Sequence, residues 1–282
     1  MVRYLDPKNN LVFKKVFGEH PDLLKSFLNA MLPLPADSLI AELQYLPTEY
    51  VPEIPEFKHT IVDVRCVDTH GRSFIVEMQL QWSNHFAQRM LFNTAATYVR
   101  QLKKGEGYDS LCPVYGLAVV DDTFTKEPEW FHHYQMMNAQ NINKTLDGIQ
   151  LVFLELPKFK PSTLIDKKLT VLWMRFLTEI NERTQSVDAD LLNAPDISKA
   201  LACTEISAYT EAELRAYDAS WDAVSSEKTL MTDNYNKGLE DGQKSERHEI
   251  IKTLLKNGLD AEFIAKSMQM DLSVVRAIEA GT

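Results

Sequence analysis

Two carboxylates, Asp63 and Glu77, are spaced as a metal site on a β-hairpin would be. They lie within IVDVRCVDTHGRSFIVEMQLQW, residues 61–82, where two β-rich runs flank a turn that contains Gly71. A three-residue loop at 69–71 places Asp63 opposite Glu77, because the numbers of opposed residues share a constant sum. Two carboxylates, a backbone carbonyl and water are the hard oxygen ligands that Mg²⁺ or Mn²⁺ prefers.

The side chains of this hairpin divide into two faces. Strand residues alternate in direction, so Glu77 and Gln79 share the face of Asp63. The other face is apolar and holds Val62, Val64, Phe74, Val76, Met78 and Leu80. Opposed like charges repel by roughly 0.2–1 kcal/mol on an exposed sheet, which favours a cation between them. The alternative is a solvated hairpin face, and a one-residue slip would send Glu77 to the other side.

The same residues resemble the signature of a nuclease superfamily. Asp63, thirteen intervening residues and Glu77-Met78-Gln79 are similar to the PD-(D/E)XK motif in the variant where Gln replaces the usual Lys. Across most of its length the chain resembles a bacterial family of recombination-promoting nucleases and transposase-like proteins. This resemblance implies an α/β fold with a PD-(D/E)XK nuclease-like mixed sheet flanked by helices, and a helical C-terminal region.

The resemblance also implies a metal-dependent DNA endonuclease that breaks DNA and promotes recombination. Asp63, Glu77 and the backbone carbonyl of Met78 would hold Mg²⁺ or Mn²⁺, which lowers the pKa of an attacking water. Gln79 would orient that water. Because a neutral amide cannot stabilise developing charge as Lys does, we expect slower or more metal-dependent cleavage.

The N-terminal segment predicts two amphipathic helices, one ended by Gly18 and one between Pro21 and Pro33. The run Asn10-Leu-Val-Phe-Lys14 resembles the family's opening motif, whose first position is often Asp. Asn10 departs from that form, which leaves an acidic role there open. Lys14 faces either bound nucleic acid at the site or solvent.

A helix capped by Ser83 is predicted to run through Lys104, with a basic stripe along one face. Arg89, Arg100 and Lys103 on this stripe could contact phosphates that flank the metal, and Gln81 could assist from the hairpin. The alternative for the stripe is a solvated helix face.

Residues 113–120, PVYGLAVV, form an apolar run typical of a strand buried on both faces, and residues 149–156 predict another strand. This element order indicates an α/β core with a mixed sheet. His132 and His133 are adjacent in the chain and therefore point apart, so we interpret them as structural or surface residues rather than metal ligands.

Three regions are predicted: a nuclease-like domain at 1–157, a helical region at 158–232, and a charged helix with a helix-turn-helix-like tail at 233–282. The last helix of the tail offers mainly Arg276 for base contacts. We therefore favour a tail that packs against a partner subunit in a homo-oligomer or modulates the nuclease.

The composition is that of a globular protein with an acidic balance. The net charge is −10, which argues against tight non-specific DNA binding. Residues 1–125 carry 12 Lys and Arg against 15 Asp and Glu, a net −3, so most of the excess acid follows the nuclease-like part. No apolar run is long enough to cross a membrane, and the three cysteines have no C-x-x-C spacing, so we expect a cytoplasmic protein without a disulfide framework.

Two other functions stay open at this point. One is a non-catalytic DNA- or protein-binding module that retains the nuclease fold, which Gln79, Asn10 and the acidic total favour. The other is an oligomeric scaffold in which the hairpin carboxylates are surface residues.

Overall fold

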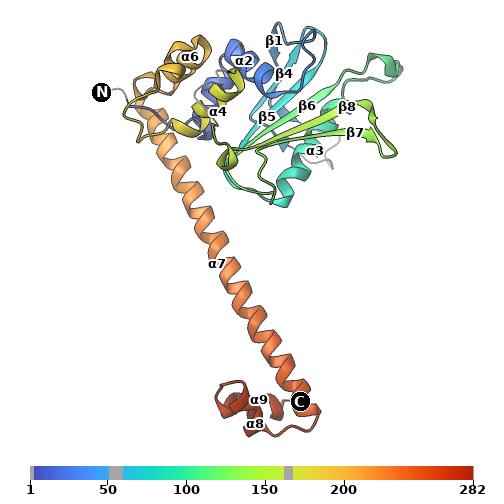
Figure 1. Cartoon of the computed structure of the whole chain (residues 1–282), viewed down its shortest axis with the longest axis vertical. Coiled ribbons are helices and arrows are strands. Elements are labelled where there is room, and N and C mark those ends of the chain that lie inside the picture. The colour runs from blue at the N-terminus through green and yellow to red at the C-terminus, as the bar shows by residue number, and fades with distance from the viewer. Residues whose placement is uncertain (1–2, 51–59, 162–167, 282) are drawn as a thin grey trace. The chain divides into compact units, whose positions relative to one another are not determined.

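The computed structural model describes residues 3–50, 60–161 and 168–281 (Figure 1). Its contacts divide the chain into two compact units, residues 1–220 and residues 221–282. The first unit contains the sheet together with the helices of residues 169–204, and the predicted boundaries at 157 and 232 stay predictions.

A six-stranded mixed sheet with the order β1-β4-β5-β6-β8-β7 forms the centre of the first unit (Figure 1). β5, β6 and β8 run parallel to one another, and the other pairs are antiparallel. The expected α/β fold is confirmed. The strands are β1 Leu43–Tyr45, β4 Val64–Asp68, β5 Ser73–Gln79, β6 Val114–Val120, β7 Phe131–Asn138 and β8 Asn141–Glu155, and β2 Glu49–Tyr50 pairs with β3 Thr60–Ile61 outside this sheet.

The β4–β5 hairpin has the predicted register. Val64 pairs with Val76, which is the register that puts Asp63 opposite Glu77. Asp63 itself is a bend residue directly before β4 rather than part of the strand. The prediction that Val62 joins the apolar face of Val64 is wrong, because the bend interrupts the alternation and Val62 packs against Ile75.

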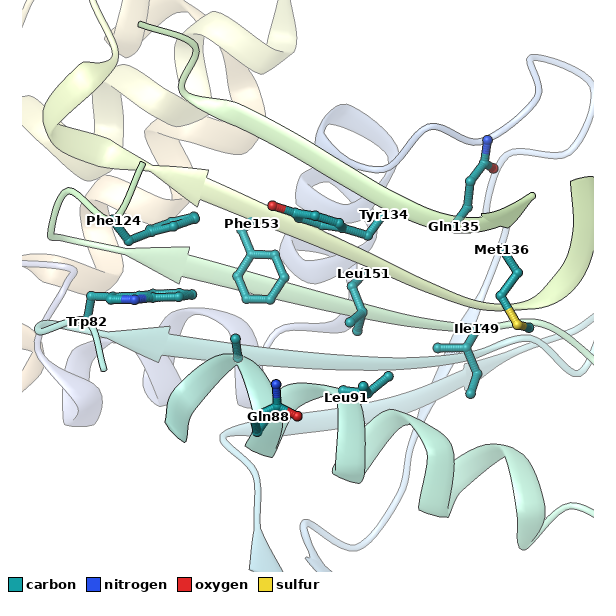
Figure 2. A pocket seen from close by; sticks show the side chains of 11 residues that line it. Trp82, Gln88, Leu91, Phe124, Tyr134, Gln135, Met136, Ile149, Leu151 and Phe153 are labelled. Atoms are coloured by element: carbon teal, nitrogen blue, oxygen red, sulfur yellow. The ribbon is translucent and has the colours of Figure 1, made fainter. Parts of the chain in front are cut away.

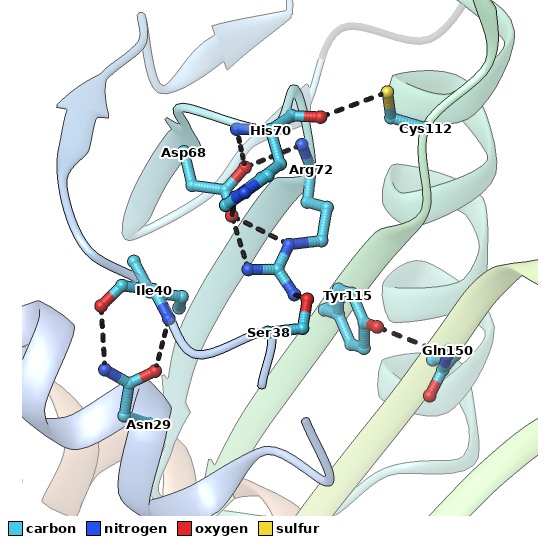
Figure 3. A network of polar contacts seen from close by, with 9 residues as sticks. All are labelled: Asn29, Ser38, Ile40, Asp68, His70, Arg72, Cys112, Tyr115 and Gln150. Carbon is cyan, nitrogen blue, oxygen red and sulfur yellow. Dashed lines mark hydrogen bonds and ion pairs between the residues drawn. The ribbon is translucent and has the colours of Figure 1, made fainter. Parts of the chain in front are cut away.

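A buried ion pair fixes the hairpin turn (Figure 3). Asp68 accepts hydrogen bonds from the backbone N–H groups of His70 and Arg72 at 3.0 and 2.9 Å. The Arg72 guanidinium returns to the same carboxylate with Nε and Nη2 both 2.7 Å from Oδ2, and Nη1 donates to Ser38. Gly71 completes the turn with φ +80°, a conformation that favours glycine.

Helices cover both faces of the sheet. α1 contacts β4 and α2 contacts β1, and both pack with α4 and α6 around the rings of Phe13, Phe17, Phe27 and Trp173. α3 covers the opposite face, where Phe86 and Met90 pack against Ala118 and Val120. The bounds are α1 Asn10–Gly18, α2 Pro21–Met31, α3 Asn84–Val99, α4 Leu169–Glu179, α5 Ala189–Asn193 and α6 Pro195–Thr204, with short 3₁₀ turns η1 Tyr108–Ser110, η2 Leu156–Lys158 and η3 Ile206–Ala208.

Three elements differ from the sequence prediction. α3 ends at Val99 instead of Lys104, because the chain turns where the Gln101 side chain exchanges two hydrogen bonds with the backbone of Cys112. β8 begins at Asn141 rather than at residue 149, and its exposed first half is too polar to be recognised as a strand. The end of the helical region expected at 158–232 and the charged helix expected after it form one helix, α7 Glu211–Lys256.

The second unit contains most of α7 and two short helices. α8 Ala261–Ser267 and α9 Leu272–Ala280 pack on Ile251 through a small apolar cluster. Asp260 and Asp271 cap them through hydrogen bonds to backbone N–H groups. Within the described ranges, no helix combines the length and the apolar character that a membrane crossing requires.

Candidate functional site

The site lies at the C-terminal end of β5, where Glu77 points toward α3. Glu77 pairs in register with Ala118, which packs under α3, so both side chains lie on the face of the sheet that α3 covers. Only 3% of Glu77 is exposed. A solvated hairpin face, the alternative for this carboxylate, is therefore wrong.

Two α3 side chains hold the Glu77 carboxylate. Arg89 Nη2 lies 3.1 Å from Oε2, and Asn93 Nδ2 donates to Oε1 at 3.1 Å. Burial raises the pKa of Glu77, and the negative charge of Asp63 raises it further. Arg89 and Asn93 act in the opposite direction, because each stabilises the charged form.

Asp63 contacts the backbone of Met78, the residue after Glu77. Its Oδ2 accepts a hydrogen bond from the Met78 backbone N–H at 2.9 Å. Its Oδ1 lies 3.3 Å from Lys14 Nζ, which reaches the site from α1. The hairpin therefore brings the Asp63 carboxylate to the backbone of the residue that follows Glu77, and each carboxylate forms an ion pair with one basic side chain.

The backbone of Met78 points toward Asp63. Both backbone groups of a strand residue face the same neighbouring strand, and the direction alternates along the chain. The carbonyl of Gln79 accepts from Asp121 N–H on the β6 side at 2.9 Å, so the N–H and C=O of Met78 project to the β4 side. The Met78 carbonyl thus lies on the strand edge that Asp63 occupies.

Gln79 is engaged at both ends of its amide. Its Oε1 accepts from Arg89 Nη2 at 3.0 Å, and its Nε2 donates to the backbone carbonyl of Gln81 at 2.8 Å. Arg89 consequently bridges Glu77 and Gln79. Gln81 joins the site through its backbone.

Asn93 is a site residue that the sequence did not single out. Its side chain is fully buried, and its Oδ1 has no hydrogen-bond partner within the described part of the chain. A buried acceptor without a donor costs roughly 1–3 kcal/mol, so such an atom beside Glu77 indicates a place for water or a bound group. The spacing of Arg89 and Asn93 by one helical turn is the only sequence signal for its role.

The donor set fits a hard divalent cation. Asp63, Glu77 and the Met78 carbonyl are oxygen donors, and carboxylate oxygens keep lone pairs beyond those used by Lys14 and Arg89. The described residues contain no cluster of three or more His, Cys, Asp or Glu that could hold a metal. Two carboxylates with water are nevertheless a usual environment for Mg²⁺.

Two of the candidate nucleic-acid-binding residues lie away from this group. Arg100 follows the last residue of α3 and is eleven residues from Arg89, about 16 Å along the helix axis. Lys103 lies beyond the helix, where its backbone N–H donates to Glu106. The structure therefore gathers Lys14, Gln81 and Arg89 at the carboxylates and leaves Arg100 and Lys103 at the far end of α3.

A second polar group adjoins Gln79 and was also not singled out. Asp121, which follows β6, pairs with Lys8 at 2.9 Å, and Lys8 lies 3.7 Å from Asp6. Burial raises the pKa of Asp6 to about 6. The Lys8–Asp121 pair ties the N-terminal segment to the end of β6. The Asp6 backbone N–H donates to Tyr217 and so ties the same segment to α7.

The adjacent histidines are structural, as interpreted from the sequence. His132 Nε2 lies 3.0 Å from the buried carboxylate of Glu155, which also pairs with Lys158 at 2.8 Å. His133 points the other way and lies 2.9 Å from Gln150.

Comparison with known proteins identifies the family. No curated protein and no solved structure matches the chain. The family model described as PD-(D/E)XK nuclease family transposase matches residues 7–233. That match spans most of the chain and includes the hairpin carboxylates and the helices around them, so this protein belongs to the PD-(D/E)XK nuclease family transposases.

Proposed function

We propose that this protein is a divalent-metal-dependent DNA endonuclease, a phosphodiesterase whose breaks promote recombination. The observation that carries the proposal is that Asp63 binds the backbone N–H of Met78, the residue after Glu77, and lies close enough for its charge to raise the pKa of Glu77. The family is one of nucleases, which supports DNA as the substrate.

The side chains divide the chemistry among them. Asp63, Glu77 and the Met78 carbonyl would hold Mg²⁺ or Mn²⁺, which supplies polarisation of the scissile phosphate and a lower pKa for the attacking water. The Gln79 amide orients that water, and Asn93 keeps the Glu77 carboxylate directed into the site.

Lys14 and Arg89 supply the positive charge that Gln79 lacks. Their side chains are 43% and 44% exposed, so each can leave its carboxylate in part and contact a phosphate. Gln81 lies beside them. Arg100 and Lys103 would contact the same DNA farther along, since about 16 Å on α3 corresponds to roughly five nucleotide steps of B-DNA.

Cleavage of supercoiled plasmid tests this proposal. Wild type should nick the plasmid only with Mg²⁺ or Mn²⁺, and Asp63→Ala and Glu77→Ala should lose at least about 100-fold in rate because each removes a metal ligand. Arg215→Ala, an exposed position on α7, is the matched control and should cleave as wild type does. Nicking that survives in both carboxylate variants would overturn the assignment.

A non-catalytic binding module that keeps the nuclease fold is the second candidate. It is favoured by one observation: Lys14 and Arg89 already neutralise Asp63 and Glu77 at 3.3 and 3.1 Å. In that case the metal would neither raise the Tm of the wild type nor support nicking, while DNA would still bind.

A further inference from the structure

An open cavity of about 460 Å³ lies on the α3 face of the sheet (Figure 2). Its wall combines the rings of Trp82, Phe124, Tyr134 and Phe153 with the aliphatic side chains of Leu91 and Ile149. Tyr134 is 52% exposed and Leu91 is 45% exposed, so much of this apolar surface faces solvent. The volume falls in the range of small-ligand sites, which is roughly 300–1,000 Å³.

The cavity lies on the same face of the sheet as Glu77, the face that α3 covers. The Arg89 guanidinium that holds Glu77 also lies over the ring of Phe86, 5.0 Å from its centroid. Phe86 meets Trp82 edge to face at 5.8 Å. Gln88, the neighbour of Arg89 on α3, lines the cavity directly. One cation and one ring therefore separate the carboxylates from the aromatic wall.

The chemistry of the wall selects a flat, neutral group. Figure 2 shows the rings of Trp82 and Phe124 lying parallel at one end, with centroids 3.9 Å apart and planes at 15°. None of the lining side chains is charged. The Gln88 amide and the Tyr134 hydroxyl are hydrogen-bonding groups on the cavity wall, and such groups pair with the edges of bases.

We propose that this cavity binds one unpaired nucleobase of the DNA strand whose phosphate lies at Asp63 and Glu77. The proposal rests on the proposed nuclease function and names the form of its substrate. A nucleotide matches the surface because its base is planar and neutral and its phosphate is anionic, as the aromatic wall and the adjacent Arg89 require. A base inside a duplex cannot enter, so the preferred substrate is single-stranded DNA or a duplex with an unpaired base.

Binding of fluorescently labelled oligonucleotides tests the proposal. In Mg²⁺-free buffer that contains EDTA, wild type should bind a 20-nucleotide single strand more tightly than the matching blunt duplex. Tyr134→Ala should bind the single strand about 10-fold more weakly, since one base stacked on an aromatic side chain contributes roughly that factor or more. Leu91→Trp, which fills the cavity from an exposed position, should give a similar loss.

Phe92→Ala is the matched control. Phe92 is an aromatic residue on the same helix, 46% exposed and outside the cavity, so its removal should leave binding unchanged. The Tm of each variant shows whether it folds, and the two cavity variants change side chains that are about half exposed.

The substrate provides an independent measurement. Single strands that each carry one abasic residue are cleaved by wild type with Mn²⁺. Cleavage should be slower when the abasic residue lies at one particular distance from the cut than when it lies elsewhere. Equal single-strand binding by wild type, Tyr134→Ala and Leu91→Trp, or cleavage indifferent to every abasic position, would overturn the base pocket and leave the endonuclease intact. Absence of any metal-dependent cleavage would instead remove the endonuclease, and the binding comparison would still decide the pocket.

Discussion

At the scale of the residue, Glu77 is a carboxylate whose burial carries an electrostatic cost. It is a carboxylate with 3% exposure beside a second carboxylate, and burial raises its pKa above the usual value of 4.5. A raised pKa in the folded state means that folding favours the protonated form. The stability that the protonated Glu77 gives the fold is present below pH 4.5 and is lost as the pH rises through the folded-state pKa. Residues that cost stability where they stand are typical of functional sites.

Replacing Glu77 by Gln should therefore separate stability from function. Glu77→Gln keeps the shape of the side chain and the neutral form, so we expect a metal-free Tm at pH 7.5 equal to or above that of wild type. The increase in Tm that Mg²⁺ gives to wild type should disappear, and metal binding by wild type should weaken as the pH falls toward the raised pKa. Differential scanning fluorimetry from pH 4.5 to 8 measures both effects, and a large loss of metal-free stability in Glu77→Gln would contradict the argument.

At the scale of the element, the distance between α3 and β6 sets the position of Arg89 and Asn93. Gly116 in β6 makes that close approach possible, because a Cβ there would lie 2.7 Å from Thr94 Oγ1 and 2.8 Å from Leu151 Cδ2. Real Cβ atoms essentially never approach another heavy atom this closely. The strand is buried along its whole length, so its neighbours have little room to move. The glycine thus lets the helix lie on the strand next to the site.

Gly116→Ala should move α3 away from the sheet. We expect a loss of about 1–3 kcal/mol in the free energy of unfolding, as is usual when a packed core receives an extra methyl group. Metal-dependent cleavage should fall at temperatures where the variant is still folded, because Asn93 and Arg89 leave Glu77. Urea denaturation and plasmid cleavage measure the two effects. Gly148→Ala, whose Cβ would meet side-chain atoms at no less than 3.5 Å, is the control and should change little.

At the scale of the whole molecule, α7 is a long helix whose middle part is exposed. It is 46 residues long, and the described side chains of residues 225–247 are all exposed. Met231, Tyr235 and Leu239 recur every four residues and lie along one side of the helix. Isolated polar helices are only marginally stable in water, so a second copy of this helix is a reasonable partner, in keeping with the homo-oligomer expected from the sequence.

Sedimentation velocity should show a homodimer that depends on this stripe. Tyr235→Glu with Leu239→Glu places charges on the shared side, and we expect a monomer at concentrations where wild type is dimeric. Ser226→Glu, an exposed change on the opposite side of α7, should leave the dimer intact. Monomeric wild type at all concentrations would exclude self-association through α7.

The sequence by itself determined the hairpin, its register, the pair Asp63 and Glu77, the family and the mixed sheet. The family follows from the resemblance of motifs. The hairpin, its register and the sheet follow from local rules: a turn fixes pairing, strand alternation fixes faces, and an apolar run fixes a buried strand such as β6. Only the tertiary structure decided that Arg89 and Asn93 hold Glu77, that Lys14 reaches Asp63 from α1, and that rings from separate segments enclose a cavity. The physical reason is that each of these contacts depends on how the helices pack on the sheet. Side-chain volumes set that packing, as the absence of a Cβ at Gly116 shows. No pattern along the chain reveals it.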